Sequence, residues 1–102
     1  MTRAALSHLD LPMLERAAKV LRVLAHPERL QLVDLLLRRP VAVGELARLI
    51  GRPQAVVSQH LTNMRAHGIV ESRRAGRHVH YYVINPNAEA LLDCLRKHGD
   101  GR

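Results

Sequence analysis

The sequence predicts a mostly α-helical domain with one β-hairpin, in the element order ααα-α-ββ-α. Five stretches place apolar residues at helical spacing. Another stretch has the pattern of two short strands joined at Ala75-Gly76. The chain has 102 residues, which is enough for one domain, and it contains no Phe or Trp. The core is therefore expected to be aliphatic.

The first helix is predicted over Leu11 to Ala25, because Asp10 can serve as its N-cap and Pro12 lies in its first turn. Two apolar stripes run along this helix, one formed by Leu14, Ala18, Leu21 and Ala25, the other by Met13, Ala17, Val20 and Leu24. One core cannot easily use both faces.

Three further helices follow in close succession. The segment Pro27 to Arg39 is apolar on nearly all sides and is stopped by Pro40, so it is expected to be the central, buried helix. A short helix over Val43 to Ile50 ends at Gly51, and the next helix spans Pro53 to His67 with Gly68 as its left-handed stop. Two short helices separated by three residues predict a helix-turn-helix.

Strands are predicted over Ile69 to Arg74 and Arg77 to Ile84, and a final helix over Pro86 to His98. The complete order is that of a winged helix-turn-helix with a helix added at each end. We expect one such domain over residues 11–98, preceded by an extension over residues 1–10 and followed by a tail over residues 99–102.

The charge balance favours a polyanionic partner. Sixteen Lys and Arg residues against nine Asp and Glu give a formal charge of +7. An acidic membrane surface would satisfy this charge as well as DNA would. The single cysteine suits a reducing interior, and the sequence shows neither a transmembrane run nor a signal-peptide pattern. We therefore expect a cytoplasmic protein that does not act at a membrane.

The helix from Pro53 to His67 is the predicted DNA-reading element. Val57, Leu61 and Met64 define its buried face, and its outer arc is short, neutral and rich in hydrogen-bonding groups. An ordinary solvated face would carry Glu and Lys, whereas no Glu, Asp or Lys occurs between Leu49 and Val70. Base contacts are expected from Gln54, Ala55, Ser58, Gln59 and Thr62, and a phosphate contact from Arg52.

Histidines near these elements are open to more than one interpretation. His60 and His67 lie at the border of the buried face and are expected to be packed or half-buried, with base contact as the less favoured alternative. They are too far apart along the helix for one metal ion. His78 and His80 share one face of a strand, a spacing that suits a metal but is also ordinary for a half-exposed strand.

The hairpin tip carries Arg73, Arg74 and Arg77. Three arginines next to a recognition helix favour contact with phosphate or insertion into the minor groove, although a solvated turn is the alternative.

Several segments together resemble ArsR/SmtB-type repressors. They are the run Val23-Leu24-Ala25-His26-Pro27-Glu28-Arg29-Leu30, the segments starting at Val43 and Ala55, and the hairpin from Gly68 to Tyr82. The resemblance covers about Leu11 to Leu95. It implies a homodimeric winged-helix repressor that pairs through its first and last helices and binds a pseudo-palindromic operator in double-stranded DNA. The dimer interface is then expected to include Leu14, Ala18, Leu21, Leu91, Leu92 and Leu95.

Such repressors commonly release DNA on binding a metal or on thiol oxidation, and here the sequence departs from the family. Residues 41–49 contain no Cys or His, and the start of the last helix has Asn85-Pro86-Asn87 in place of a carboxylate and histidine pair. Cys94 and His98 remain as a candidate transition-metal pair, with further ligands from the partner subunit or from His8 and Asp10. The favoured alternative is a cysteine packed at the dimer interface, and a single-cysteine redox switch is also open.

The predicted function is a sequence-specific, dimeric transcriptional regulator, a repressor released by a metal or thiol signal, with no metal required for folding. The alternatives are a constitutive or architectural DNA binder with no inducer site, and a protein-interaction module. An enzyme is not expected, because the sequence shows neither a nucleophile–base pair nor a phosphate loop.

Overall fold

The computed structural model describes residues 9–99. This part of the chain folds into α2 (Leu11–Leu24), α3 (Pro27–Arg38), β1 (Val41–Ala42), α4 (Val43–Ile50), α5 (Gln54–Ala66), β2 (Val70–Ala75), β3 (His78–Val83) and α6 (Pro86–His98). Every predicted helix and strand is present, with its ends within one residue of the predicted positions. The winged helix-turn-helix prediction is confirmed, and β1 is an element that it did not include.

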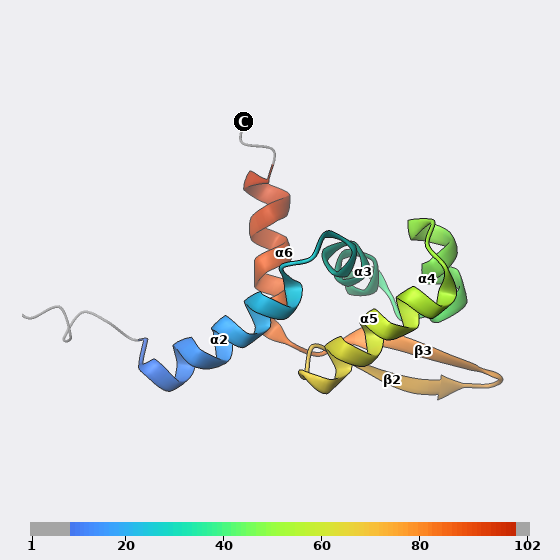
Figure 1. Cartoon of the computed structure of the whole chain (residues 1–102), viewed down its shortest axis with the longest axis horizontal. Coiled ribbons are helices and arrows are strands. Elements are labelled where there is room, and N and C mark those ends of the chain that lie inside the picture. Colours follow the sequence, from blue (N-terminus) through green and yellow to red (C-terminus); the bar gives the residue numbers. More distant parts are fainter. Residues whose placement is uncertain (1–8, 100–102) are drawn as a thin grey trace, which may run out of the picture.

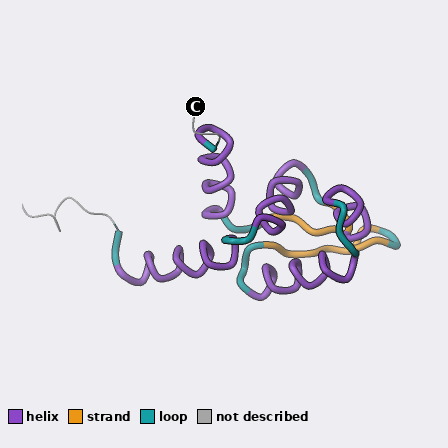
Figure 2. Tube along the Cα trace, turned by 45° about the horizontal axis from the view of Figure 1, so that its top comes forward, coloured by secondary structure: helices purple, strands orange, loops and turns teal. Residues whose placement is uncertain are grey.

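The helices α3, α4 and α5 gather above the sheet, and the β2–β3 hairpin reaches past them as a wing (Figure 1). α2 projects away on the other side, and α6 rises near the junction of these two parts. Figure 2 shows the same division after a turn of the molecule. The predicted DNA-reading elements and the projecting helix therefore lie at opposite ends of the protomer.

Local sequence signals account for the helix and hairpin ends. Asp10 Oδ1 accepts a hydrogen bond from the Met13 N–H at 2.9 Å and caps α2. Gly51 ends α4 with a φ of 69°, a left-handed conformation that favours glycine. Gly76 has a φ of 64° and is the first of two loop residues between the paired Ala75 and His78, the arrangement that a tight hairpin requires.

The sheet has the antiparallel order β1-β3-β2. β2 and β3 pair from Val70↔Val83 at the base of the wing to Ala75↔His78 at its tip. β1 contributes only Val41 and Ala42, which pair with Tyr81 and His80. This short strand fixes the start of α4 to the middle of the wing.

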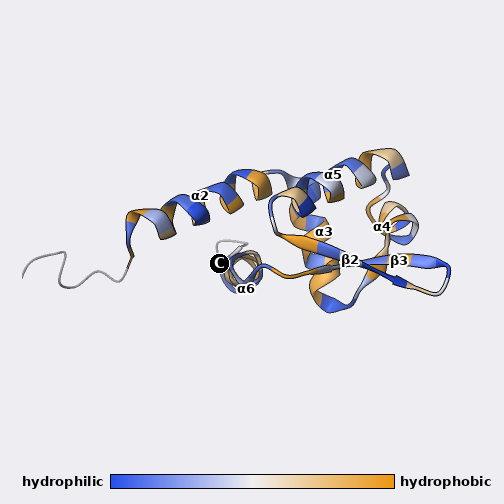
Figure 3. Cartoon of the chain, turned by 90° about the horizontal axis from the view of Figure 1, so that it is seen from below, coloured by the Kyte–Doolittle hydropathy of each residue, from blue (hydrophilic) through white to orange (hydrophobic). Residues whose placement is uncertain are grey.

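The core is aliphatic, as predicted, and it lies where α2, α3, α4, α5, α6 and the sheet meet. Its fully buried side chains include Leu24, Leu32, Leu46, Leu61, Met64 and Ile69. On α2, Val20, Val23 and Leu24 face this core, whereas Leu14 and Leu21 are 46% and 51% exposed. The protomer therefore buries α2 near its C-terminal end and leaves Leu14 and Leu21 open, together with Met13 of the other stripe, which is 40% exposed. Figure 3 shows apolar residues at several places along the projecting α2.

One residue of the predicted dimer interface was wrongly assigned. Leu92 is 6% exposed and belongs to the core of its own protomer, because α6 packs against α2 and α3 and buries Leu92 together with Ala88. Leu95, one turn further along, is 40% exposed and Leu91 is half-buried. None of the helices within residues 9–99 is long and apolar enough to cross a bilayer.

Candidate nucleic-acid interface

α5 separates its residues into two clearly different faces. Val57, Leu61 and Met64 are fully buried, which confirms the predicted inner face. On the outside, Gln54, Ala55, Gln59 and Thr62 are exposed and Ser58 is half-buried. The side chains predicted to read bases therefore share one accessible, uncharged face, whose amide and hydroxyl groups can both donate and accept hydrogen bonds.

The start of α5 is open towards solvent. Pro53 is its N-cap, and within the described chain no side chain caps the first turn. The first N–H groups of a helix have no partner inside the helix, and together with the helix dipole they favour an anion. This end of α5 is suited to a phosphate.

Arg52, the predicted phosphate contact, lies just before the start of α5 and pairs with a residue of α3. Its Nε forms an ion pair with Glu28 Oε2 at 2.6 Å, and its side chain remains 46% exposed. Glu28 lies on α3, more than 20 positions earlier in the chain. Sequence reasoning therefore did not identify the partner of Arg52.

The wing presents its arginines to solvent. Arg73, Arg74 and Arg77 are all exposed, and the alternation of a strand places Arg73 and Arg74 on opposite faces of the ribbon. The Arg73 guanidinium lies 5.7 Å from the centre of the Tyr82 ring, so this side chain stacks on the wing itself. Arg74 and Arg77 are the better placed for a partner.

The two histidines of the fourth predicted helix have different environments. His60 is 9% exposed, which confirms the expectation of a packed residue. The expectation for His67 is wrong: it is exposed at the C-cap of α5, and its Nδ1 contacts the Asn63 carbonyl oxygen at 2.9 Å. α5 has ended at this point, and its C-cap residue is exposed.

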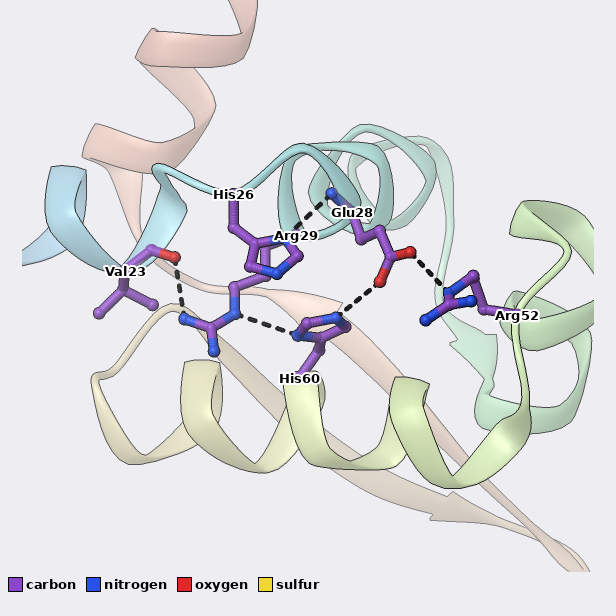
Figure 4. A network of polar contacts seen from close by, with 6 residues as sticks. All are labelled: Val23, His26, Glu28, Arg29, Arg52 and His60. Atoms are coloured by element: carbon purple, nitrogen blue, oxygen red, sulfur yellow. Dashed lines mark hydrogen bonds and ion pairs between the residues drawn. The ribbon is translucent and has the colours of Figure 1, made fainter.

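His60 joins a polar network between α3 and α5 (Figure 4). Its Nε2 lies 2.9 Å from Glu28 Oε1, and its Nδ1 accepts from Arg29 Nε at 3.2 Å. Arg29 also donates to the Val23 carbonyl oxygen and to Asn63 Oδ1. The hydrogen bond from His60, and next the positive charge of Arg52, hold the pKa of Glu28 below its ordinary value of 4.5.

His26, Glu28 and His60 are the one group of three potential metal ligands among residues 9–99, with one ligand atom from each within 4.8 Å of the others. Sequence reasoning missed this group because His60 is more than 30 positions away from the other two in the chain. The candidate pair Cys94 and His98 lies on α6, where both residues are exposed, and neither belongs to that group. His8, a proposed further ligand, lies outside the described residues.

His78 and His80 share a face of β3, with ring centres 6.4 Å apart. Within residues 9–99 no third ligand joins them.

α5 is the second helix of a helix-turn-helix, and its outer face is uncharged and able to form hydrogen bonds. Together with the open start of α5 and the basic wing, this face defines a winged-helix DNA-binding protein. Residues 26–72 match the bacterial regulatory protein, arsR family. The chain is 34% identical over 83 residues to the HTH-type transcriptional regulator YgaV of Escherichia coli, covering 80% of this chain and 84% of that protein. It therefore belongs to the ArsR family of transcriptional regulators.

Two solved structures show the same fold. The transcriptional repressor PagR of Bacillus anthracis matches with a TM-score of 0.77 and 32% identity, over 84% of this chain and 99% of that one. A homodimeric winged helix-turn-helix DNA-binding domain from Mycobacterium bovis matches with a TM-score of 0.75 and 29% identity, over 92% and 87% of the two chains. The family is one of DNA-binding regulators and not of enzymes.

Proposed function

We propose that this chain is a homodimeric repressor that recognises a pseudo-palindromic DNA operator through the exposed face of α5. The observation that carries the proposal is the uncharged hydrogen-bonding face formed by Gln54, Ala55, Ser58, Gln59 and Thr62. A binder without sequence preference relies mainly on Lys and Arg, whereas amide and hydroxyl groups discriminate between base edges. Repression is also the role named for the similar PagR.

Dimerisation is proposed from the apolar surface that the protomer leaves open. Leu14 and Leu21 on α2 and Leu95 on α6 are between 40% and 51% exposed, and these helices contact each other within the protomer. A second copy would cover this surface and place two α5 helices about 34 Å apart, one per half-site. The M. bovis neighbour is itself described as homodimeric.

The test is fluorescence anisotropy with a duplex selected from a randomised pool and with its scrambled counterpart, at matched salt. Gln59→Ala should weaken binding to the selected duplex by about tenfold or more and leave binding to the scrambled duplex unchanged. Gln31→Ala, a change of the same kind at an exposed position of α3, is the control. Equal affinity of the wild type for both duplexes would contradict specific recognition.

We further propose that a signal at Cys94 releases the DNA, through a metal shared with His98 or through thiol oxidation. Support comes from the exposure of Cys94 on α6, the helix that carries the open apolar residue Leu95. Metal content and DNA affinity should be measured for the reduced wild type and for Cys94→Ala, each before and after treatment with Zn²⁺ or peroxide. Release in the wild type that is abolished in the variant supports the proposal, and equal behaviour of the two proteins contradicts it.

A further inference from the structure

Glu28 on α3 contacts both the turn before α5 and α5 itself (Figure 4). One carboxylate oxygen, Oε2, forms an ion pair with Arg52 Nε in the turn before α5, and the other, Oε1, contacts His60 Nε2 in the middle of α5. These two contacts are eight residues apart in the chain. A single carboxylate therefore links the entry to the recognition helix with its inner face.

The direction of each hydrogen bond follows from the chemistry of the groups. Arginine has no acceptor, so Arg29 Nε donates and His60 Nδ1 accepts. In the neutral imidazole the proton then lies on Nε2 and is donated to Glu28 Oε1. The second oxygen is left for the ion pair with the Arg52 guanidinium.

The same geometry disfavours a metal ion at His26, Glu28 and His60. Coordination through Nε2 would leave the remaining proton of each neutral ring on Nδ1. In His60 that proton would face the Arg29 N–H, and in His26 it would face the Glu28 N–H, which now donates to Nδ1 at 3.3 Å. Two guanidinium groups, those of Arg29 and Arg52, also contact the cluster. The cluster is better explained as a hydrogen-bonded support.

We propose that Glu28 is a positioning residue for DNA recognition, which holds Arg52 so that its two Nη groups can receive a phosphate at the start of α5. The proposal rests on the proposed function. Arg52 meets Glu28 through Nε at 2.6 Å, and its side chain is 46% exposed, so part of the guanidinium stays accessible to a phosphate. A free arginine side chain loses considerable rotamer freedom on binding, and a fixed one loses less.

The sign of the effect separates this proposal from a simple charge argument. Removing a negative charge makes the protein more cationic, and charge alone would then tighten binding to DNA. Positioning predicts the opposite. In Glu28→Gln the amide oxygen can still accept from His60, but the amide N–H₂ group would face the Arg52 N–H, so Arg52 is no longer held in place.

The experiment is a double-mutant cycle of Glu28→Gln and Arg52→Ala, measured by anisotropy with the selected and the scrambled duplex at matched salt. Glu28→Gln alone should weaken binding to the selected duplex by about tenfold, the scale of one charge-assisted hydrogen bond. In the Arg52→Ala background the same change should have no further effect. Asp34→Asn is the charge-matched control, because Asp34 also lies on α3 but pairs with Arg96 of α6.

Two results would overturn the proposal. Tighter binding by Glu28→Gln would show that the carboxylate only competes with DNA for Arg52. An equal decrease in affinity in both backgrounds would show that Glu28 acts through the folding of α5, and circular dichroism and thermal unfolding of each variant would reveal that loss of structure independently. If the wild type itself does not distinguish the two duplexes, the proposed function fails.

Discussion

At the scale of the residue, His60 and His67 show how position along one helix decides the role of a side chain. Both follow the same apolar periodicity, but His60 faces the start of α3, where Arg29 supplies a donor and Glu28 an acceptor. His67 lies at the C-cap, and its Nδ1 contacts the local backbone at the Asn63 carbonyl oxygen. A buried polar side chain needs both partners, and only the first site provides them.

The lowered pKa of Glu28 predicts how acid affects stability. A carboxyl group whose folded-state pKa lies below its ordinary value of 4.5 stabilises the fold above that pH. The contribution disappears as the pH falls through the lowered pKa, because the carboxyl is then protonated. The free energy of unfolding of the wild type should therefore exceed that of Glu28→Gln at pH 6, and this excess should shrink as the pH falls below 4.5.

Urea unfolding of both proteins at several pH values and at equal protein concentration would measure this difference. An excess that stays constant over the whole range would contradict the assigned role of the ionised carboxylate. His26, His60 and Arg52 are the other titratable or charged groups that act on Glu28.

Gly51 provides a second prediction at this scale. Its φ of 69° is unfavourable for any residue with a Cβ atom, although no neighbour lies within 4 Å of the added atom. Gly51→Ala should therefore lower the free energy of unfolding by about 1 kcal/mol through backbone strain alone. Gly44→Ala is the matched control, because its Cβ would meet only Gln54 Oε1 at an ordinary 3.6 Å, and it should be neutral or slightly stabilising.

At the scale of the element, the wing combines a locally coded turn with a position that depends on the whole fold. Gly76 and the alternation of β2 and β3 specify the hairpin and its register. Its direction relative to α5 is set by contacts outside the hairpin, namely the pairing of Val41 with Tyr81 and the ion pair between Arg65 Nε and Glu71 Oε1 at 2.7 Å.

Arg74 should provide a sequence-independent interaction with a phosphate. Removing one phosphate interaction lowers the slope of log affinity against log salt by about 1, so Arg74→Ala should reduce the slope by about 2 for a dimer. The decrease in affinity should be the same for selected and scrambled duplexes. Arg38→Ala, which removes the same charge from the C-terminal end of α3, should leave the slope nearly unchanged, and an equal reduction in both variants would contradict a specific role for the wing.

At the scale of the whole molecule, a single protomer leaves the open stripe of α2, with Leu14 and Leu21, exposed to solvent. Leu21→Glu should place a charge in the proposed interface and produce monomers at concentrations at which the wild type is dimeric. Affinity for the selected duplex should fall by about tenfold or more, because two half-sites are no longer bound by one linked pair of helices.

Sedimentation velocity would follow the oligomeric state, with Leu49→Glu as the control. Leu49 is 43% exposed on α4, so this variant introduces the same charge at a comparable apolar position outside the open stripe. Dissociation of both variants, or of neither, would contradict an interface on α2.

The sequence by itself determined the helices, the hairpin, the aliphatic core and the outward face of α5, because each depends on residues within a few positions of one another. Only the tertiary structure decided that Leu92 faces the core of its own protomer and that Val41 and Ala42 form a strand. It also decided that Glu28 contacts both Arg52 and His60. These features depend on packing between segments far apart in the chain, and periodicity and spacing carry no information about such packing. The DNA-reading face of α5 could therefore be predicted from neighbouring residues, whereas the polar network behind it forms only when α3 and α5 pack together.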